Sequence, residues 1–98
     1  MNHLVLSARL VERGALRTTP AGLAALDLVL KHESQMSEAG SARKVSVELR
    51  ALALGAVTSE LARLPVGERL DAAGFLSSQR NGRGVVLHIT RMSPASAH

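Results

Sequence analysis

Residues 43–65 read RKVSVELRALALGAVTSELARLP, a strand pattern followed directly by a helix pattern. Apolar and polar residues alternate over residues 43–51, which is typical of a half-buried strand with three inward side chains, Val45, Val47 and Leu49. The apolar residues that follow also fit the spacing of a helix, and Gly55 separates the two patterns. We therefore predict a strand over residues 43–51 and a short helix over residues 58–64, capped by a hydroxyl from Thr58-Ser59-Glu60 and ended by Pro65.

Alternating patterns on both sides of this stretch predict four more strands. They cover residues 3–12, 23–33, 69–77 and 85–92. The second of these is the clearest, because its even-numbered residues from 24 to 30 are all apolar. Gly74 lies within the fourth strand of the chain and indicates a β-bulge or a tight bend. The Asn81-Gly82 pair predicts a hairpin turn between the last two strands.

Two segments between these strands lack any period. Residues 13–22 are rich in glycine, proline and threonine, and they predict a loop or a hairpin connection. Residues 33–42 are small and polar, so we expect a long exposed hairpin loop there.

The order of these elements indicates a fold class. Five strands with one short helix between the third and the fourth match an OB-fold, a five-stranded Greek-key barrel. Other small barrels and a sandwich stay open on the pattern alone. A chain of 98 residues has room for a single ordinary domain. We predict an all-β OB-fold domain over residues 1–93 and a flexible C-terminal tail over residues 94–98.

The composition excludes several kinds of chemistry. The chain has no cysteine, tryptophan or tyrosine and a single phenylalanine, Phe75, which rules out thiolate chemistry and disulfides and disfavours extensive base stacking. None of the four histidines has the spacing of a metal ligand set, and no serine lies in a nucleophile motif. We predict no enzymatic activity, no cofactor and no metal site, with His32 and His88 packed at strand surfaces.

Basic residues outnumber acidic residues by 12 to 8, and the formal net charge is +4. This balance points to a polyanionic partner, nucleic acid first and an anionic membrane surface second. Oligonucleotides bind OB-folds on the second and third strands and on the loops beside them. Seven cations fall at these places and are the candidate nucleic-acid-binding residues: Arg13, Arg17, Lys31, Arg43, Lys44, Arg80 and Arg83. Small proteins also collect arginines in exposed loops for solubility, and this alternative stays open.

The sequence offers no membrane or export signal. The apolar run at the N-terminus is too short for a signal peptide, and no stretch reaches the roughly 18 apolar residues of a membrane span. We therefore expect a cytoplasmic protein without membrane contact.

Short segments spread over nearly the whole chain resemble one known family in their order and spacing. They are NHLVLS at 2–7, LR at 16–17, PAG at 20–22, VLKHES at 29–34, EAG at 38–40, VG at 66–67, GFLS at 74–77, NG at 81–82 and VLH at 86–88. In these segments the chain is similar to the primosomal replication protein N (PriB) family, which belongs to the single-stranded-DNA-binding OB-folds. The resemblance implies a homodimer that binds single-stranded DNA when stalled replication forks restart. It also implies contacts with the restart helicase PriA and with the single-stranded-DNA-binding protein.

Carried over residue by residue, the resemblance implies DNA contacts by four arginines: Arg17, Arg43, Arg80 and Arg83. The aromatic residues that enterobacterial members present to DNA fall at Ser41 and Ser46 in this chain, and a basic position of the family is Glu33. Stacking on a ring is worth about 1–3 kcal/mol per base, so we expect phosphate binding with little aromatic stacking. Phe75, beside Gly74 in its strand, is expected to pack in or near the barrel.

The missing rings leave a second function open. A dimeric OB-fold adaptor for other replication proteins, with weak or no DNA binding, fits the same sequence. Val5 and Val11 are apolar residues on the outward face of the first strand, and they support a dimer.

Overall fold

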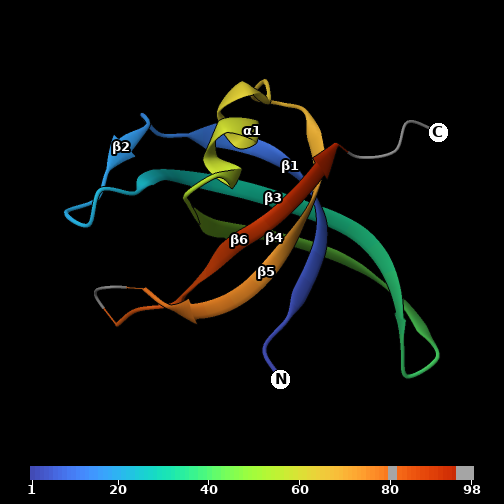
Figure 1. Cartoon of the computed structure of the whole chain (residues 1–98). Coiled ribbons are helices and arrows are strands. Elements are labelled where there is room, and N and C mark those ends of the chain that lie inside the picture. Colours follow the sequence, from blue (N-terminus) through green and yellow to red (C-terminus); the bar gives the residue numbers. More distant parts are fainter. Residues whose placement is uncertain (80–81, 95–98) are drawn as a thin grey trace.

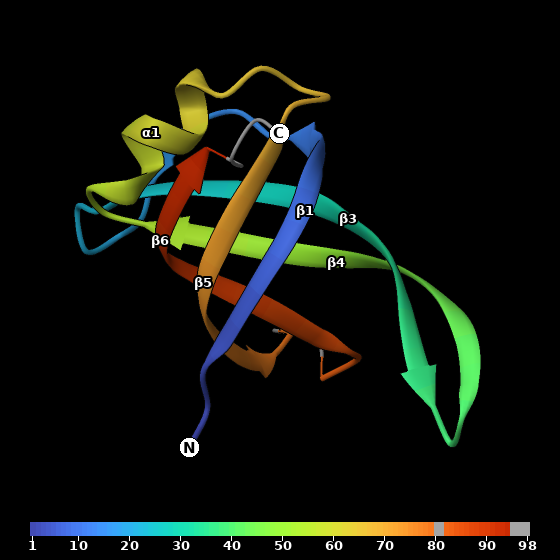
Figure 2. The ribbon, with the colours of Figure 1, turned by 90° about the vertical axis from the view of Figure 1, so that its right-hand side faces the viewer.

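Five long strands wind into a barrel, and a short helix lies at one end of it (Figures 1 and 2). The structure is a computed structural model of the chain, and it describes residues 1–79 and 82–94. The long strands are β1 (Leu4–Arg13), β3 (Ala24–Glu38), β4 (Ser41–Leu54), β5 (Arg69–Ser78) and β6 (Val85–Pro94). The other elements are the two-residue strand β2 (Arg17–Thr18) and the helix α1 (Val57–Arg63).

The strands close into a ring in the order β1-β5-β6-β4-β3, and pairing between β1 and β3 completes it. β4 and β6 run parallel, whereas the other neighbouring strands run antiparallel. Closure removes most strand edges, which protects a small all-β protein from edge-to-edge association. The helix lies between β4 and β5, so the predicted OB-fold order is confirmed, with β3 and β4 as its second and third strands.

Leucine and alanine side chains fill the inside of the barrel. The alternation predicted for β1 is confirmed, since Ala8 and Leu10 are buried while Ser7 and Arg9, which alternate with them, are exposed. The largest fully buried side chains are Leu10, Leu26, Leu30, Leu61, Leu70 and Leu87. Burial of one such leucine stabilises the fold by about 1.5–3 kcal/mol. The core therefore holds together without an aromatic ring, and Leu61 anchors α1 on the end of the barrel.

The segment predicted as a long loop, residues 33–42, is strand instead, and the prediction was wrong. β3 and β4 stay paired as far as Glu38 and Ser41. A two-residue turn of Ala39 (φ 51°) and Gly40 (φ 80°) joins them, and positive φ at both positions is typical of a tight hairpin turn.

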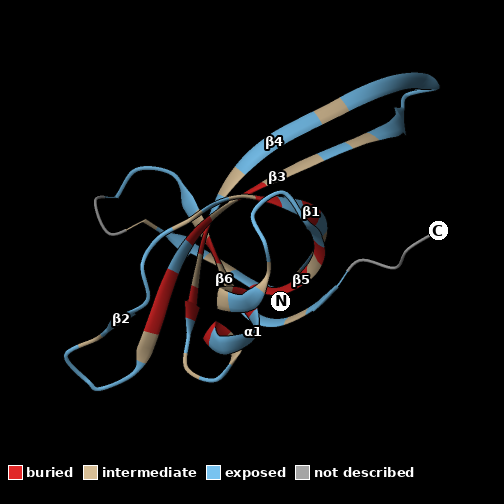
Figure 3. Cartoon of the chain, turned by 90° about the horizontal axis from the view of Figure 1, so that it is seen from above, coloured by how far each residue is buried: buried red, intermediate tan, exposed pale blue. Residues whose placement is uncertain are grey.

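We call residues 33–46 the arm, the part of the β3–β4 hairpin that extends beyond the barrel (Figure 3). Nearly all of its residues are exposed. Backbone pairing needs no particular side chains, whereas the alternating pattern arises only where one face of a strand is buried. Residues 33–42 of the arm therefore show no alternation of apolar and polar residues in the sequence. Val47, predicted to point inward, is exposed because it lies at the base of the arm.

α1 begins at Val57, one residue earlier than predicted, and no side chain caps its N-terminus. The predicted capping hydroxyl was wrong. The hydroxyls of Thr58 and Ser59 instead donate to the carbonyl oxygens three residues earlier, at 2.6 and 2.8 Å. Serine and threonine within helices often bond backward in this way.

The bulge predicted at Gly74 is confirmed. The register of β5 against β6 shifts between Ala73 and Gly74. A Cβ atom at residue 74 would lie 1.7 Å from the carbonyl oxygen of His88, so no side chain fits there. This close approach lets β5 bend while it stays paired with β6.

The hairpin predicted at Asn81-Gly82 lies partly outside the described residues, because Arg80 and Asn81 are not described. At the base of the connection, the Gln79 N–H donates to the Gly84 carbonyl oxygen at 3.1 Å. β5 and β6 are thus joined by a short connection, as predicted.

At the C-terminus, β6 continues through Pro94, and residues 95–98 are not described. A flexible tail over residues 94–98 stays a prediction. Within residues 1–79 and 82–94, no helix has the length and apolar character needed to cross a membrane.

Candidate nucleic-acid interface

The outer surface of β3 and β4 joins two groups of projecting segments. Figure 1 shows β2 and the adjoining ends of β5 and β6 on one side of the barrel and the arm projecting from the opposite side, and the view from above agrees (Figure 3). We call the paired strands β3 and β4 the ribbon. The molecule measures 49 × 34 × 23 Å along its principal axes, so the ribbon offers an elongated surface. The predicted cations are spread along this surface and do not form one cluster.

Arg17 holds the first loop against the ribbon. β2 pairs with the start of β3, and the Arg17 guanidinium forms an ion pair with Asp27 of β3, with Nη2 and Oδ2 3.0 Å apart. The Arg17 Nε also donates to Oδ2 at 3.1 Å. Both side chains are exposed, and such a pair is worth about 0–1 kcal/mol. A phosphate therefore competes readily with the carboxylate for Arg17.

Arg13 has a structural contact. Its Nη1 donates to the carbonyl oxygens of Leu64 and Leu61 at the C-terminal end of α1. Carbonyls at a helix C-terminus lack partners within the helix, and a guanidinium satisfies them while complementing the helix dipole. Arg13 thus ties the end of β1 to the helix, and its guanidinium is only partly available to a ligand.

Arg43 and Lys44 lie side by side in the arm but face opposite ways. Successive side chains of a strand point to opposite faces, and the register places Arg43 opposite Met36 and Lys44 opposite Gln35. The Arg43 Nε lies 2.8 Å from a carboxylate oxygen of Glu38, and both side chains are exposed. Each face of the arm therefore carries one cation and one carboxylate, Lys44 and Glu33 on one face and Arg43 and Glu38 on the other.

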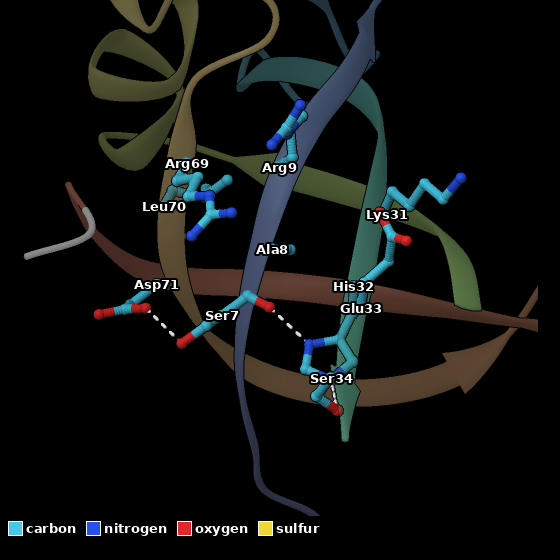
Figure 4. Close-up of a pocket in the computed structure, with 10 residues that line it drawn as sticks. All are labelled: Ser7, Ala8, Arg9, Lys31, His32, Glu33, Ser34, Arg69, Leu70 and Asp71. Carbon is cyan, nitrogen blue, oxygen red and sulfur yellow. Dashed lines mark hydrogen bonds between the residues drawn. The ribbon is translucent and has the colours of Figure 1, made fainter. Parts of the chain in front are cut away.

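Lys31 lies with two arginines that sequence reasoning missed. In the strand register Arg9 of β1 is opposite Lys31 of β3, and it is also opposite Arg69 of β5. These three cations line a surface hollow of about 590 Å³, shown in Figure 4. They are far apart in the sequence and meet only through strand pairing. The sequence indicated only that Arg9 and Lys31 point outward from their strands, and it did not indicate that they meet.

His32 bridges two strands at this hollow (Figure 4). Its Nδ1 is 2.6 Å from the Ser7 carbonyl oxygen, and its Nε2 is 2.8 Å from the Ser34 hydroxyl. Because the carbonyl oxygen only accepts, Nδ1 carries the proton. The Ser7 hydroxyl donates to Asp71 of β5 at 2.6 Å. His32 therefore packs at a strand surface, as predicted.

The β5–β6 connection carries the last two predicted cations. Arg83 is exposed, and Arg80 lies outside the described residues. Arg50 was not among the predicted cations, yet it is exposed on the outer surface of β4, opposite Val29 of β3 and Val86 of β6. It lies between the first loop and the arm and adds to the charge of the ribbon.

Phe75 contradicts the expectation that it packs in or near the barrel. Its side chain is 39% exposed and stacks on the ring of His88, with centroids 4.7 Å apart and planes 11° apart. Its neighbours Gly74 and Leu76 point inward, so alternation turns Phe75 outward. That alternation was visible in the sequence. His88 packs at the strand surface, as predicted.

The positions that carry aromatic residues in enterobacterial relatives are polar here. Ser41 and Ser46 are both exposed in the arm, and Ser46 is paired with Glu33. The arm therefore presents charge and hydroxyls to a ligand. In the part of the chain that the structure describes, no group of three or more histidine and carboxylate side chains is placed to hold a metal ion.

The closed five-stranded barrel and its β3–β4 ribbon define an OB-fold of the single-strand binding class. Residues 2–91 match the profile of a family described as "Another single-strand binding protein family". The fold is similar to the wild-type single-stranded DNA binding protein from Thermus aquaticus, with 28% identity and a TM-score of 0.77. That match covers 98% of this chain and 50% of the other chain.

Two further comparisons identify the family within this class. The replication restart protein PriB of Bordetella pertussis is 47% identical over 90 residues, which are 91% of this chain and 84% of that protein. The structure of PriB from Ralstonia solanacearum is 38% identical with a TM-score of 0.89, and the match covers 98% of this chain and 99% of that chain. The chain belongs to the PriB family of replication restart proteins, and the predicted resemblance is confirmed.

Proposed function

We propose that this chain binds single-stranded DNA through backbone phosphates, as an accessory protein of the replication-restart primosome. The observation that carries the proposal is the distribution of cations along the β3–β4 ribbon in a member of the PriB family. A strand laid along the outer surface of the ribbon passes Arg17 at the first loop, Arg50 on the barrel and Lys44 on the arm. It reaches Arg43 by passing around the arm to the opposite face. Arg83 flanks this path from the β5–β6 connection, and Arg80, which lies outside the described residues, stays a predicted contact.

The binding is mainly electrostatic. Each phosphate that a lysine or arginine neutralises releases counterions, which gives a slope of about −0.7 in log K against log salt per contact on a single strand. Lys31 adds to this charge from the outer surface of β3, whereas Arg13 adds less because α1 occupies its guanidinium. The arm offers no position for base stacking, since residues 33–46 contain no aromatic ring.

The protein acts as a homodimer in the cytoplasm, as a binding protein and not as an enzyme. Its partners are the restart helicase PriA and the single-stranded-DNA-binding protein. Val5, an apolar residue that is 62% exposed on the outward face of β1, supports a dimer because a second copy of the chain would cover it. Sedimentation at micromolar concentration should give twice the mass of one chain, and a species of single mass would contradict the dimer.

A dimeric adaptor that binds DNA weakly or not at all is the alternative function. The observation that favours it is the exposed Ser41 and Ser46, which offer no ring to a base. The cations along the ribbon would then contact acidic groups of protein partners.

A salt titration separates the two functions. Fluorescence anisotropy of labelled oligo-dT, measured over a range of salt concentrations, should give micromolar or tighter binding at low salt and a steep salt dependence. No binding at low salt would leave only the adaptor.

Two arginine variants test whether DNA binds along the ribbon. Arg43→Ala should weaken binding and make the salt slope less steep by about 0.7, because it removes one phosphate contact. The matched control is Arg63→Ala, which removes an exposed arginine from α1, outside the two strands of the ribbon. Equal effects of the two variants would contradict a DNA path along the ribbon.

A further inference from the structure

The one phenylalanine of the chain forms an aromatic surface on the outside of the barrel. Phe75 of β5 and His88 of β6 are directly opposite in the strand register, and their nearly parallel rings are 4.7 Å apart. The chain has no tryptophan or tyrosine and a single phenylalanine, so Phe75 carries its only benzene ring. An exposed ring that is held by a parallel, stacked neighbour offers a surface on which another planar group stacks.

The register places this ring pair next to the ribbon. His88 is paired with Leu52 of β4, and Leu52 is paired with Asp27 of β3, which binds Arg17. Paired residues of neighbouring strands point to the same side of a sheet. The row from Phe75 to Asp27 therefore lies on one outer surface and connects the ring pair to the first loop.

A cation lies in the adjacent row. Arg50 precedes Leu52 by two residues, a distance of about 7 Å along a strand. It is exposed, and within residues 1–79 and 82–94 no carboxylate lies within ion-pair distance of it. Its guanidinium is thus available to a phosphate that neighbours a base on the ring.

We propose that Phe75, supported by His88, is a base-stacking position for single-stranded DNA, with Arg50 binding an adjacent phosphate. The proposal rests on the proposed function, and it names the one part of the chain that contacts a base. It places a ring on the barrel in a chain whose arm has none.

The surroundings of the ring favour a base over an apolar protein segment. The neighbouring outward residues include the polar and charged Asp27, Arg50 and Ser77 as well as the half-buried Leu52 and Val86, so charged and apolar side chains alternate around Phe75. Aromatic anchors at protein interfaces are instead desolvated within a larger packed patch. A stacked base requires only the face of a ring and cations along the backbone path.

Tryptophan in place of Phe75 gives a direct optical test. Phe75→Trp would be the only indole in the chain, so quenching of its emission by oligo-dT reports contact with a base. The control is Val66→Trp, at an exposed position between α1 and β5. Oligo-dT should quench the emission of the residue 75 variant and leave that of the residue 66 variant unchanged.

A second test compares two ligands on one variant. Phe75→Leu keeps the apolar character and removes the ring. Its affinity for oligo-dT should fall about 5- to 150-fold, with an unchanged salt slope because no charge is lost. Its affinity for an abasic deoxyribose-phosphate oligomer of the same length should stay within about twofold of the unmodified chain, because that ligand has no base to stack.

The outcomes separate this inference from the proposed function. Anisotropy that shows oligo-dT binding, without quenching at residue 75, overturns the stacking position and leaves phosphate binding intact. Equal losses of affinity for oligo-dT and the abasic oligomer also overturn it, because the ring then acts only through the structure. Absence of binding by the unmodified chain overturns both.

Discussion

β3 and β4 are paired along their whole length, yet the two halves of this ribbon differ in what surrounds them. In the barrel half, Leu26, Leu28 and Leu30 of β3 are buried in the core. In the arm the same two strands keep their pairing, while nearly every side chain is exposed. Strand pairing is thus common to both halves, and burial is limited to one. We expect stability to reside in the barrel half, and the arm to contribute charge and reach.

The largest expected difference in stability comes from adding one methyl group to a glycine of the barrel, Gly74 of β5, and to a glycine of the arm, Gly40. Gly74→Ala should cost about 4 kcal/mol or more, because the new Cβ atom would lie 1.7 Å from the His88 carbonyl oxygen and would break the pairing of β5 with β6. Gly40→Ala, at the tip of the arm, meets nothing within 4 Å and carries only the strain of a positive φ, about 1–2 kcal/mol. Urea unfolding of both variants measures the difference, and similar losses would contradict the contrast.

A truncation on each half of β3 is expected to have the next largest effect. Leu30→Ala removes a fully buried side chain and should destabilise the protein by about 2–5 kcal/mol. Met36→Ala, at a position that is 58% exposed in the arm, should change stability by no more than about 0.5 kcal/mol. If thermal unfolding gave a large loss for Met36→Ala, the arm would be packed against another surface, such as a second copy of the chain.

Shortening the arm should affect DNA binding more than stability. Ser34 and Val45 are paired, so replacing residues 35–44 by Asn-Gly closes the hairpin with a two-residue turn. We expect a change in stability of no more than about 1 kcal/mol, because few buried contacts are lost. The loss of Arg43 and Lys44 should make the salt slope for oligo-dT less steep by about 1.4, which is two phosphate contacts. An unchanged slope would show that the arm does not contact DNA.

The smallest expected effect is on the ion pair of the arm. Glu38→Gln removes the carboxylate that binds Arg43. An exposed pair of this kind contributes about 0–1 kcal/mol, so the melting temperature should hardly change. Anisotropy should show oligo-dT affinity rising by no more than about fivefold, because Arg43 is released for a phosphate. Weaker binding would mean that Glu38 holds Arg43 in its binding position.

Part of the candidate site followed from the sequence, and part did not. The positions of Arg17, Arg43 and Lys44 beside the second and third OB strands follow from the strand pattern alone. The group of Arg9, Lys31 and Arg69 did not, because its members come from three strands whose register no local pattern reports.

The arm and Phe75 were missed for different physical reasons. An alternating pattern appears only where a buried face selects apolar residues, so the exposed arm leaves no trace in its side chains. Phe75 was expected inside because aromatic rings usually are, although the inward Gly74 and Leu76 on either side turn it outward.

By itself, the sequence determined the order of the five long strands, the place of the helix, the leucines of the core and the bulge at Gly74. These features depend on local spacing and on the burial of alternate residues. Only the tertiary structure decided which side chains meet: Arg13 with the end of α1, Arg9 with Lys31 and Arg69, and Phe75 with His88. Register between distant strands is set when the barrel closes, and a shift of one residue would turn every outward side chain inward.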